Sequence, residues 1–290
     1  MDSQPKETIM KTRKYIAVCA ARDEEKFIKA SLLSVLNQTI PPELCILSDD
    51  GSKDDTPFIA ENVGAVVIHN YVDRHNMKEI NQVIALKIGI AIATKEVPDW
   101  EFLLKFDGDT KIPPTYVEHL LDKMEENPQL GVCSGRPEGE KIRLARASDA
   151  AKIYRRGCWD DIKGLDMCIA FDSHALLKAS QAGWDTGTIS TITFKEMRPS
   201  GVYGLRRWIL TGFERATFGL PLYHTIFASL KNVKRGSPPI LNAIATIFSH
   251  IINPWPKAPN LDHEWIKNHY AINEIRFFIN EIIGARGTKG

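Results

Sequence analysis

The sequence predicts an α/β fold, in which a mostly parallel, doubly wound sheet is followed by a helical C-terminal extension. In the first half of the chain, short apolar runs typical of strands alternate with patterns typical of helices. This alternation favours parallel strands that are joined by helical crossovers. The 290 residues are 43% hydrophobic and 25% charged, which is the composition of an ordinary globular protein with enough length for a sizeable core.

Each element of the predicted sheet domain follows from its local pattern. The expected strands cover residues 15–21, 44–48, 65–69, 102–106 and 131–134. We expect Asp23 to cap the first helix, because Glu24 and Glu25 then stand in a first turn that favours acidic side chains. Further helices are expected over residues 56–62, 80–93 and 114–126. We place this domain at residues 14–204, after a polar tail at residues 1–13.

Residues 205–290 are expected to form the helical extension, with a last helix over residues 265–283. Aromatic and basic residues alternate in its first part, which leaves two interpretations open. Residues 205–256 could pack on the domain as a lid, or they could present a basic amphipathic face to anionic lipid. The longest apolar run, 240–252, is interrupted by polar residues and is shorter than the roughly 18–20 apolar residues that span a bilayer.

Charge and cysteine content narrow the class of protein and its location. The net charge of +1 gives no reason to expect nucleic acid as a partner, although residues 195–290 carry 13 basic and 6 acidic side chains. The five cysteines form no CxxC pair, which favours reduced thiols in a cytosolic protein. The N-terminal residues lack the apolar core of a signal peptide. We therefore expect a cytoplasmic protein, with peripheral contact at the cytoplasmic face of the membrane as the open alternative.

The most informative stretch is the predicted strand 102–106 together with Asp107, Gly108 and Asp109, which follow it. Two carboxylates around a flexible glycine can turn toward one divalent cation, which they bind as hard oxygen ligands. The position just past a parallel strand is where open α/β sheets bind their ligands. A metal ion held there could carry a diphosphate. Asp-Gly-Asp is also ordinary turn chemistry, so this stretch alone does not establish a site.

Two more acidic turns are predicted at the same edge of the sheet. The first strand continues into Arg22-Asp23-Glu24-Glu25, and the second continues into Asp49-Asp50-Gly51-Ser52. An Asp at such an edge can accept hydrogen bonds from a ribose or a base. Each turn alone is explained by helix-cap or turn preference. Three acidic turns at one edge favour a nucleotide site.

In the order and spacing of these motifs, roughly residues 14–220 resemble the family 2 glycosyltransferases, which have the GT-A fold. The resemblance implies an inverting enzyme that takes its sugar from a nucleotide-diphosphate donor. It implies that Asp49 contacts the nucleoside, and that Asp107 and Asp109 serve the ribose and a metal–diphosphate with Mn²⁺ or Mg²⁺ as cofactor. The full nucleotide-sugar-binding set that it implies is Ala21, Arg22, Glu24, Asp49, Asp50, Ser52, Arg74, Lys87, Asp107 and Gly108.

The resemblance also suggests a general base and a third metal ligand. Relatives place their base before a helix that ends in Gly-aromatic, and Asp172 is the acid that this chain keeps there. Asp172 would take the proton of the acceptor hydroxyl, although it also suits a helix N-cap. His174 is expected to be structural. Glu196 stands where many relatives have a metal-binding His, so the expected metal set is Asp107, Asp109 and Glu196.

The expected reaction is a single sugar addition to a glycan or lipid-linked acceptor, in cell-surface glycan or glycolipid synthesis. The charge-rich residues 135–170 are expected to form a mobile loop that sets the acceptor. Two alternatives remain open. One is a sugar-phosphate nucleotidyltransferase, against which the absence of glycine in Ala20-Ala21-Arg22-Asp23 counts. The other is a protein that binds the sugar nucleotide without turnover, which Phe171 in place of an expected acid keeps in view.

Overall fold

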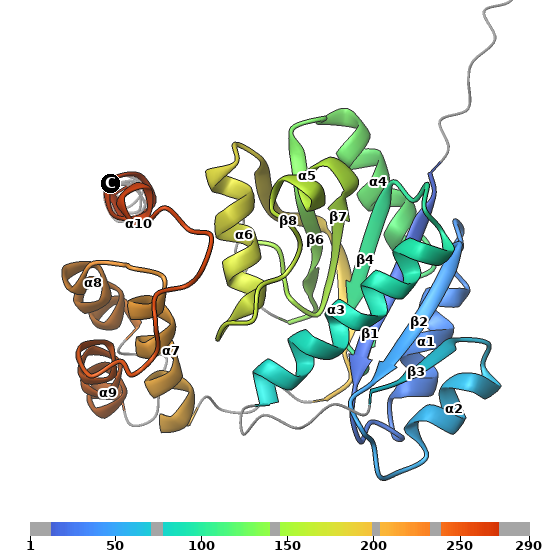
Figure 1. Cartoon of the computed structure of the whole chain (residues 1–290), viewed down its shortest axis with the longest axis horizontal. Helices are drawn as coiled ribbons and strands as arrows, with labels where there is room; N and C mark the ends of the chain where they lie inside the picture. Colours follow the sequence, from blue (N-terminus) through green and yellow to red (C-terminus); the bar gives the residue numbers. More distant parts are fainter. Residues whose placement is uncertain (1–12, 71–77, 140–145, 199–203, 233–238, 273–290) are drawn as a thin grey trace, which may run out of the picture. The chain divides into compact units, whose positions relative to one another are not determined.

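The computed structural model describes residues 13–70, 78–139, 146–198, 204–232 and 239–272 (Figure 1). The chain divides into two units that are interleaved along the sequence. Unit 1 contains the described parts of Met1–Asp73, Ala85–Asp160 and Asp185–Met197. Unit 2 contains the described parts of Arg74–Ile84, Asp161–Trp184 and Arg198–Gly290. The predicted boundaries at residues 13 and 204 stay predictions.

Unit 1 is built on an eight-stranded sheet with the strand order β3-β2-β1-β4-β7-β6-β8-β5. The strands are β1 (Tyr15–Ala21), β2 (Leu44–Asp49), β3 (Val66–His69), β4 (Phe102–Phe106), β5 (Thr110–Lys111), β6 (Leu130–Pro137), β7 (Ala151–Arg155) and β8 (Asp185–Glu196). The first four strands pair in parallel, as predicted. From β4 onward the sheet is mixed, because β7 runs antiparallel to both β4 and β6, while β8 runs parallel to β6. The α/β class is confirmed, and the expectation of a mostly parallel sheet holds only for its first half.

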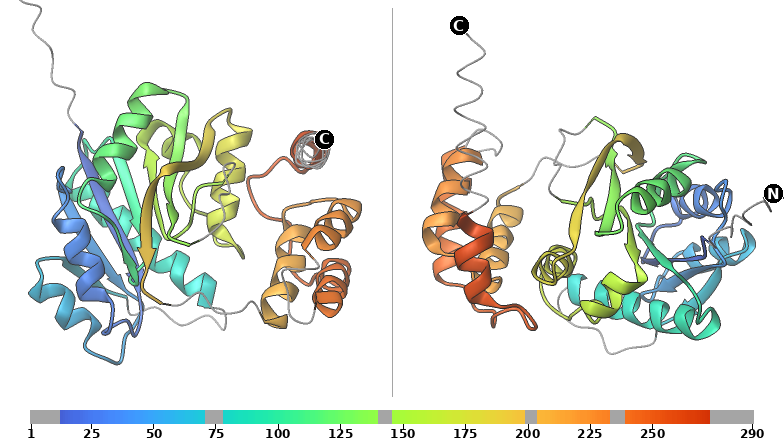
Figure 2. Two further views of the ribbon diagram at one scale, coloured as in Figure 1. Left: turned by 180° about the vertical axis from the view of Figure 1, so that it is seen from behind. Right: turned by 90° about the horizontal axis from the view of Figure 1, so that it is seen from above.

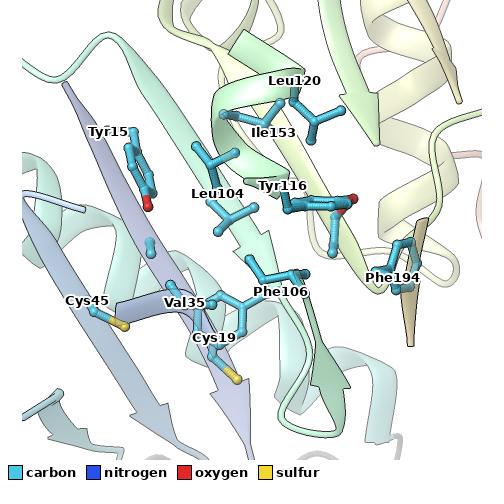
Figure 3. Close-up of a cluster of buried hydrophobic side chains, with 14 of the residues drawn as sticks. Tyr15, Cys19, Val35, Cys45, Leu104, Phe106, Tyr116, Leu120, Ile153 and Phe194 are labelled. Carbon is cyan, nitrogen blue, oxygen red and sulfur yellow. The ribbon is translucent and has the colours of Figure 1, made fainter. Parts of the chain in front are cut away.

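Four helices of the sheet region lie close to their predicted positions: α1 (Ile28–Leu36), α2 (Thr56–Asn62), α3 (Lys78–Glu96) and α4 (Tyr116–Glu126). A fifth, α5 (Arg156–Asp161), was not predicted. The core lies between the sheet and α1 and α4, where Leu104 and Phe106 of β4 pack with Tyr116 and Val35 (Figure 3). All five residues of β4 are buried, which explains why this strand reads as an unbroken apolar run apart from Lys105.

Two local expectations about unit 1 are wrong. Asp23 does not cap a helix, because its backbone adopts a left-handed conformation (φ 54°) and α1 begins at Ile28, after a turn. Residues 135–170 are not one loop: they contain the end of β6, all of β7 and α5. Residues 140–145 lie outside the described part of the chain.

Unit 2 is helical in its described part. Its elements after β6 are α6 (Phe171–Gln181), α7 (Leu205–Thr217), α8 (Leu222–Asn232), α9 (Pro239–Ile251), α10 (His263–Trp265) and the π-helical turn η2 (Ile266–Tyr270). Helix α9 packs against both α7 and α8 (Figure 2). The predicted helix 265–283 is described only as far as residue 272. Within the described ranges, no helix combines the length and the apolar character that a membrane crossing requires.

Candidate functional site

The parallel half of the sheet brings the three acidic turns to one edge. In the register of the strands, Ala21 of β1 pairs with Asp49 of β2, and Cys19 of β1 pairs with Phe106 of β4. The turns that follow β1, β2 and β4 therefore leave the sheet beside one another. This is the edge at which open α/β sheets bind their ligands.

The first two turns are joined by hydrogen bonds. The backbone N–H of Asp23 donates to Ser52 Oγ at 3.0 Å, and the N–H of Lys53 donates to Asp23 Oδ1 at 2.8 Å. The N–H of Glu24 donates to Thr56 Oγ1 at 2.7 Å. Arg22 Nε donates to Asp23 Oδ2 at 3.3 Å, and the N–H of Asp50 donates to the carbonyl of Ala21 at 2.9 Å. Arg22, Glu24, Asp50 and Ser52, which were predicted to bind nucleotide, thus belong to one hydrogen-bonded platform.

Asp54 holds this platform from the side of the second turn. Burial acts to raise the pKa of its carboxyl group, but hydrogen bonds from the Thr56 hydroxyl and from backbone N–H groups, including that of Glu25, outweigh burial and lower the pKa. The N–H of Glu25 donates to Asp54 Oδ2 at 3.1 Å. A carboxylate that accepts several bonds in this way stays charged and fixes the loop.

Asp49 lies deeper in the same edge, with 3% of its surface exposed. Both of its carboxylate oxygens lie 3.2 Å from the N–H of Ser52, which closes the turn around Gly51 at a positive φ of 71°. Nδ1 of His69, at the end of β3, is 3.8 Å from Asp49 Oδ2. The carboxylate of Asp49 is therefore held in one orientation at the base of the edge.

The third turn packs tightly on the first. A Cβ atom added at Gly108 would stand 3.3 Å from Ala21 Cβ and 3.3 Å from Glu24 Cγ, so a larger side chain there would push the two turns apart. Asp107 and Asp109 flank this contact and are both partly exposed. The structure thus brings Ala21, Glu24, Asp107, Gly108 and Asp109 together, as the sequence predicts.

Lys105 is a part of this edge that sequence reasoning missed. It is only 2% exposed, and its ammonium group donates to Asp107 Oδ1 and to the carbonyl of Asp149, both at 2.7 Å. On the neighbouring strand β7 the buried Lys152 donates to Asp149 Oδ1 at 2.9 Å. Burial acts to raise the pKa of Asp149, but the two ammonium groups outweigh it and lower the pKa. The available signal was a single lysine inside an otherwise apolar run.

Glu196 reaches the same neighbourhood through β8. Strand β5 pairs with the end of β8 so that Thr110 stands opposite Glu196, and the N–H of Met197 donates to the carbonyl of Asp109 at 2.8 Å. In the part of the chain that the structure describes, no three His, Cys, Asp or Glu side chains converge closely enough to hold a metal ion. The donor chemistry nevertheless fits Mg²⁺ or Mn²⁺, because all three predicted ligands are carboxylates and all leave the sheet at this edge.

Three further predicted residues, Arg74, Lys87 and Asp172, are not part of the acidic turns. Arg74 lies outside the described residues. Lys87 is exposed on α3. Asp172 belongs to unit 2 and stands in the first turn of α6. The cap position is Ala170, in a left-handed conformation, so the alternative role of Asp172 as an N-cap is wrong, while its role as the base stays a prediction.

His174 has the structural role that was expected. It is fully buried, it stacks on Phe218 with the ring centroids 6.1 Å apart, and Nε2 lies 2.8 Å from the carbonyl oxygen of Pro259. Burial lowers the pKa of His174. All five cysteines are buried and free, so the expectation that they form no disulfide is confirmed, while the cytosolic location stays a prediction.

Solved structures resemble the chain in fold. A mannosyltransferase from Pyrobaculum calidifontis, in complex with GDP-Man and Mn²⁺, superposes with a TM-score of 0.55 at 16% identity, covering 83% of this chain and 71% of that chain. A mycobacterial protein superposes with a TM-score of 0.53 at 15% identity, covering 70% and 74%. At such low identity these likenesses show the fold alone.

Curated relatives resemble the chain in sequence. The poly-beta-1,6-N-acetyl-D-glucosamine synthase of Staphylococcus epidermidis is 28% identical over 124 residues, which are 41% of this chain and 27% of the relative. The putative glycosyltransferase EpsH of Bacillus subtilis is 28% identical over 148 residues, 50% of this chain and 40% of the relative. The matches thus span less than half the length of these relatives. Residues 16–175 match the sequence model of glycosyl transferase family 2, so the chain belongs to this family and has the GT-A fold.

Proposed function

We propose that this chain transfers a sugar from a nucleoside-diphosphate donor to an acceptor hydroxyl, with the aid of a divalent cation. The observation that carries the proposal is the junction of three acidic turns at one sheet edge, where hydrogen bonds join the first two and Gly108 packs against the first. Family membership supports the reaction class. The donor, the metal dependence and the stereochemistry are parts of the proposal.

In this proposal the platform binds the nucleotide half of the donor. Asp49, whose orientation is fixed, accepts hydrogen bonds from the nucleoside, and Asp107 serves the ribose. Arg74 and Lys87 supply positive charge for the diphosphate, Arg74 in a bidentate contact and Lys87 as a point charge. The remaining contacts are assigned to Ala21, Arg22, Glu24, Asp50, Ser52 and Gly108.

Asp107, Asp109 and Glu196 would hold Mn²⁺ or Mg²⁺. A divalent cation held by these residues would neutralise charge that develops on the leaving diphosphate. Lys105 donates to Asp107 Oδ1 at 2.7 Å and so fixes the orientation of this carboxylate for its role. The mannosyltransferase with the same fold is known in complex with GDP-Man and Mn²⁺, which supports the choice of cofactor.

Asp172 would act as the general base that takes the proton from the acceptor hydroxyl. The acceptor oxygen would attack the anomeric carbon from the face opposite the diphosphate, which inverts the configuration at that carbon. One sugar would be added to each acceptor. The acceptor is proposed to be a glycan or a lipid-linked glycan in cell-surface glycan or glycolipid synthesis. The relationship to a polysaccharide synthase and to EpsH supports this assignment.

The test is a calorimetric titration of the purified chain with a panel of sugar nucleotides, in Mn²⁺ and in EDTA. We expect one nucleotide to bind in Mn²⁺ and to bind at least about tenfold more weakly in EDTA or in Asp109→Ala. Asp172→Asn should keep this binding and lose transfer by about a hundredfold or more. No binding to any sugar nucleotide would overturn the proposal.

A second assay separates an enzyme from a protein that only binds the donor. Sugar-nucleotide hydrolysis is measured in Mn²⁺ for the native chain and for Asp172→Asn. Turnover above background that falls in Asp172→Asn supports the enzyme. Binding with no turnover, with or without candidate acceptors, would instead indicate a sugar-nucleotide-binding protein.

A further inference from the structure

Helix α9 of unit 2 exposes its large apolar side chains. Ile240 is 69% exposed and Phe248 is 58% exposed. These residues recur at helical spacing along one side of the helix. The exposed apolar residues of α9 are Ile240, Leu241, Ile244, Phe248 and Ile251, and Ile252 follows directly. A row of this kind is unusual on a water-facing helix, where polar residues face outward.

The opposite side of α9 is polar and buried. Asn242, Thr246 and Ser249 are each only 2% exposed. The hydroxyl of Thr246 donates to the backbone carbonyl of Trp208 on α7 at 3.1 Å. The helix is therefore amphipathic in the inverted sense, with its polar side turned toward a neighbouring helix and its apolar side turned outward.

Helix α8 repeats this inversion. His224, Thr225 and Ser229 are buried. Thr225 Oγ1 accepts a hydrogen bond from Arg215 Nε of α7 at 3.1 Å and lies 2.9 Å from His250 Nδ1 of α9. The exposed apolar residues of α8 are Leu222, Tyr223, Ile226 and Leu230. A hydrogen-bonded polar interior thus lies among α7, α8 and α9, and two of these helices are apolar on the outside.

The contact between α7 and α9 is also unusually close. A Cβ atom added at Gly212 of α7 would stand 2.0 Å from Ser249 Oγ and 2.3 Å from the carbonyl oxygen of Thr246. Close approach over glycine and small hydroxyl residues, with large apolar residues outside, is the packing of helices that face lipid. In water the hydrophobic effect would favour the reverse arrangement.

We propose that the exposed apolar faces of α8 and α9, called here the apolar face, dock on the surface of an anionic lipid bilayer. Helix α9 has 13 residues and is therefore about 20 Å long, which suits a helix lying at the boundary between headgroups and acyl chains. The 13 basic and 6 acidic side chains of residues 195–290 suit anionic headgroups. A second copy of the chain would bring the same excess of positive charge, which disfavours it as the occupant.

The experiment is flotation of the full chain with vesicles, either of phosphatidylcholine alone or of phosphatidylcholine with one quarter phosphatidylglycerol. The test variant is Ile244→Glu with Phe248→Glu. The matched control is Phe58→Glu on α2, an aromatic residue of similar exposure (64%) that lies in unit 1. Circular dichroism and the unfolding midpoint establish that each variant is folded, which we expect because all three positions are exposed.

We expect the native chain and Phe58→Glu to float with the anionic vesicles, and the double variant to bind them at least about tenfold more weakly. Binding to the neutral vesicles should be weaker, and salt should reduce binding to the anionic ones. No flotation of the native chain, or equal flotation of the folded double variant, would overturn the proposal. A dimer in sedimentation that the double variant splits, without flotation, would assign the face to a second copy and also overturn it.

This proposal goes beyond the proposed sugar transfer and does not depend on it. Vesicle binding needs neither donor nor metal ion, so it is measured in EDTA, where the nucleotide site is not expected to function. Loss of flotation with intact nucleotide binding would therefore refute the membrane surface alone. Loss of nucleotide binding with intact flotation would refute the proposed reaction alone.

Discussion

Unit 1 and the helices α7, α8 and α9 of unit 2 place polar and apolar side chains in opposite ways. In unit 1 the interior is apolar, with Leu104 and Phe106 at its centre, and the polar turns lie at the edge of the sheet. Among the helices α7, α8 and α9 of unit 2 the interior is polar, with Thr225 and Thr246 buried, while large apolar side chains such as Phe248 lie outside. Unit 1 is organised as a protein in water, and these helices are organised as a protein in contact with an apolar phase.

The buried polar groups of the candidate site and of the helices α7, α8 and α9 also differ in kind. At the site they include charge pairs: Lys105 bonds Asp107, and Lys152 bonds Asp149. In the three helices most are neutral hydroxyl groups, of which those of Thr246 and Ser249 donate to backbone carbonyls. Removing one partner of a buried charge pair is costly, whereas hydroxyl–carbonyl bonds mainly fix how the helices pack. Buried charge pairs therefore hold the candidate site in place, and buried hydroxyl groups fix the packing of α7, α8 and α9.

The largest expected effect is a difference in the free energy of unfolding between two phenylalanine variants, one from each of these environments. Phe106→Ala, at a side chain that is 1% exposed, should lower the free energy of unfolding by about 3–5 kcal/mol. Phe248→Ala should change it by no more than about 0.5 kcal/mol, because the side chain contributes little to the interior. Urea unfolding followed by circular dichroism measures both. If Phe248→Ala lowered the free energy of unfolding by more than about 2 kcal/mol, Phe248 would belong to a core, and the contrast between the two environments would be wrong.

The second prediction concerns the close contact of α7 with α9. Gly212→Ala should destabilise the protein by about 1–3 kcal/mol, because the added methyl group meets Ser249 Oγ and the carbonyl of Thr246. Gly204→Ala, where an added Cβ meets nothing within 4 Å, is the control, with an expected change within about 0.5 kcal/mol. The unfolding midpoint of each variant measures the difference. Equal unfolding midpoints for the two variants would show that α7 and α9 move apart at little cost, which would contradict a close contact at Gly212.

How far the sequence predicts the fold differs between strands of the same sheet. The strands Tyr15–Ala21 and Phe102–Phe106 were predicted at their observed bounds, because buried parallel strands read as apolar runs. Strand β7 was not predicted, since Lys152 and Arg155 interrupt its apolar pattern. The structure explains this: Lys152 is buried against Asp149, a pairing that local pattern does not reveal.

The candidate site shows the same division. The meeting of the three acidic turns was predictable, because the C-terminal ends of parallel strands share one edge of a sheet. The bonds that join Asp23 to Lys53 and Glu24 to Thr56 are long-range and leave no local signal. In α9, the polar residues between apolar ones were taken as interruptions of an apolar run. Periodicity gives the two sides of a helix but not which of them is buried, so the inversion became visible only in the fold.

The third prediction uses two histidines of unit 2, His174, which is fully buried, and His250, which is partly buried. Burial lowers the pKa of both His174 and His250. In the unfolded chain the histidine pKa values are about 6.5, so just below that pH the unfolded chain binds more protons than the folded chain. Stability that is fully present above about pH 6.5 should fall as the pH drops through and below this value, by at most about 1.4 kcal/mol per pH unit for each histidine.

His174→Gln separates this effect from general acid denaturation. Glutamine can still donate to the carbonyl of Pro259, but it does not titrate. Urea unfolding at a series of pH values between about 5 and 8 should show a shallower slope for the variant than for the native chain. An unchanged slope would exclude His174 as a source of the acid sensitivity and assign it to His250 or to the carboxylates of unit 1, such as Asp149, whose pKa is lowered and whose stabilisation is also lost on acidification.

The smallest expected effect tests whether the polar interior of the three helices is needed for stability in water. Asn242 is buried, and within the described residues neither its amide nitrogen nor its amide oxygen has a hydrogen-bond partner. Asn242→Leu has a similar volume and removes a desolvated amide, so it should raise the free energy of unfolding by about 1 kcal/mol. Thr246→Val on the same side removes the bond to the carbonyl of Trp208 and should lower it by about 1 kcal/mol. Opposite signs in urea unfolding would mean that only the hydrogen-bonded part of this interior stabilises the helices. A lower free energy of unfolding for both variants would mean that the amide of Asn242 also stabilises the helices. The interior among α7, α8 and α9 would then depend on its polar groups throughout, unlike the apolar core of unit 1.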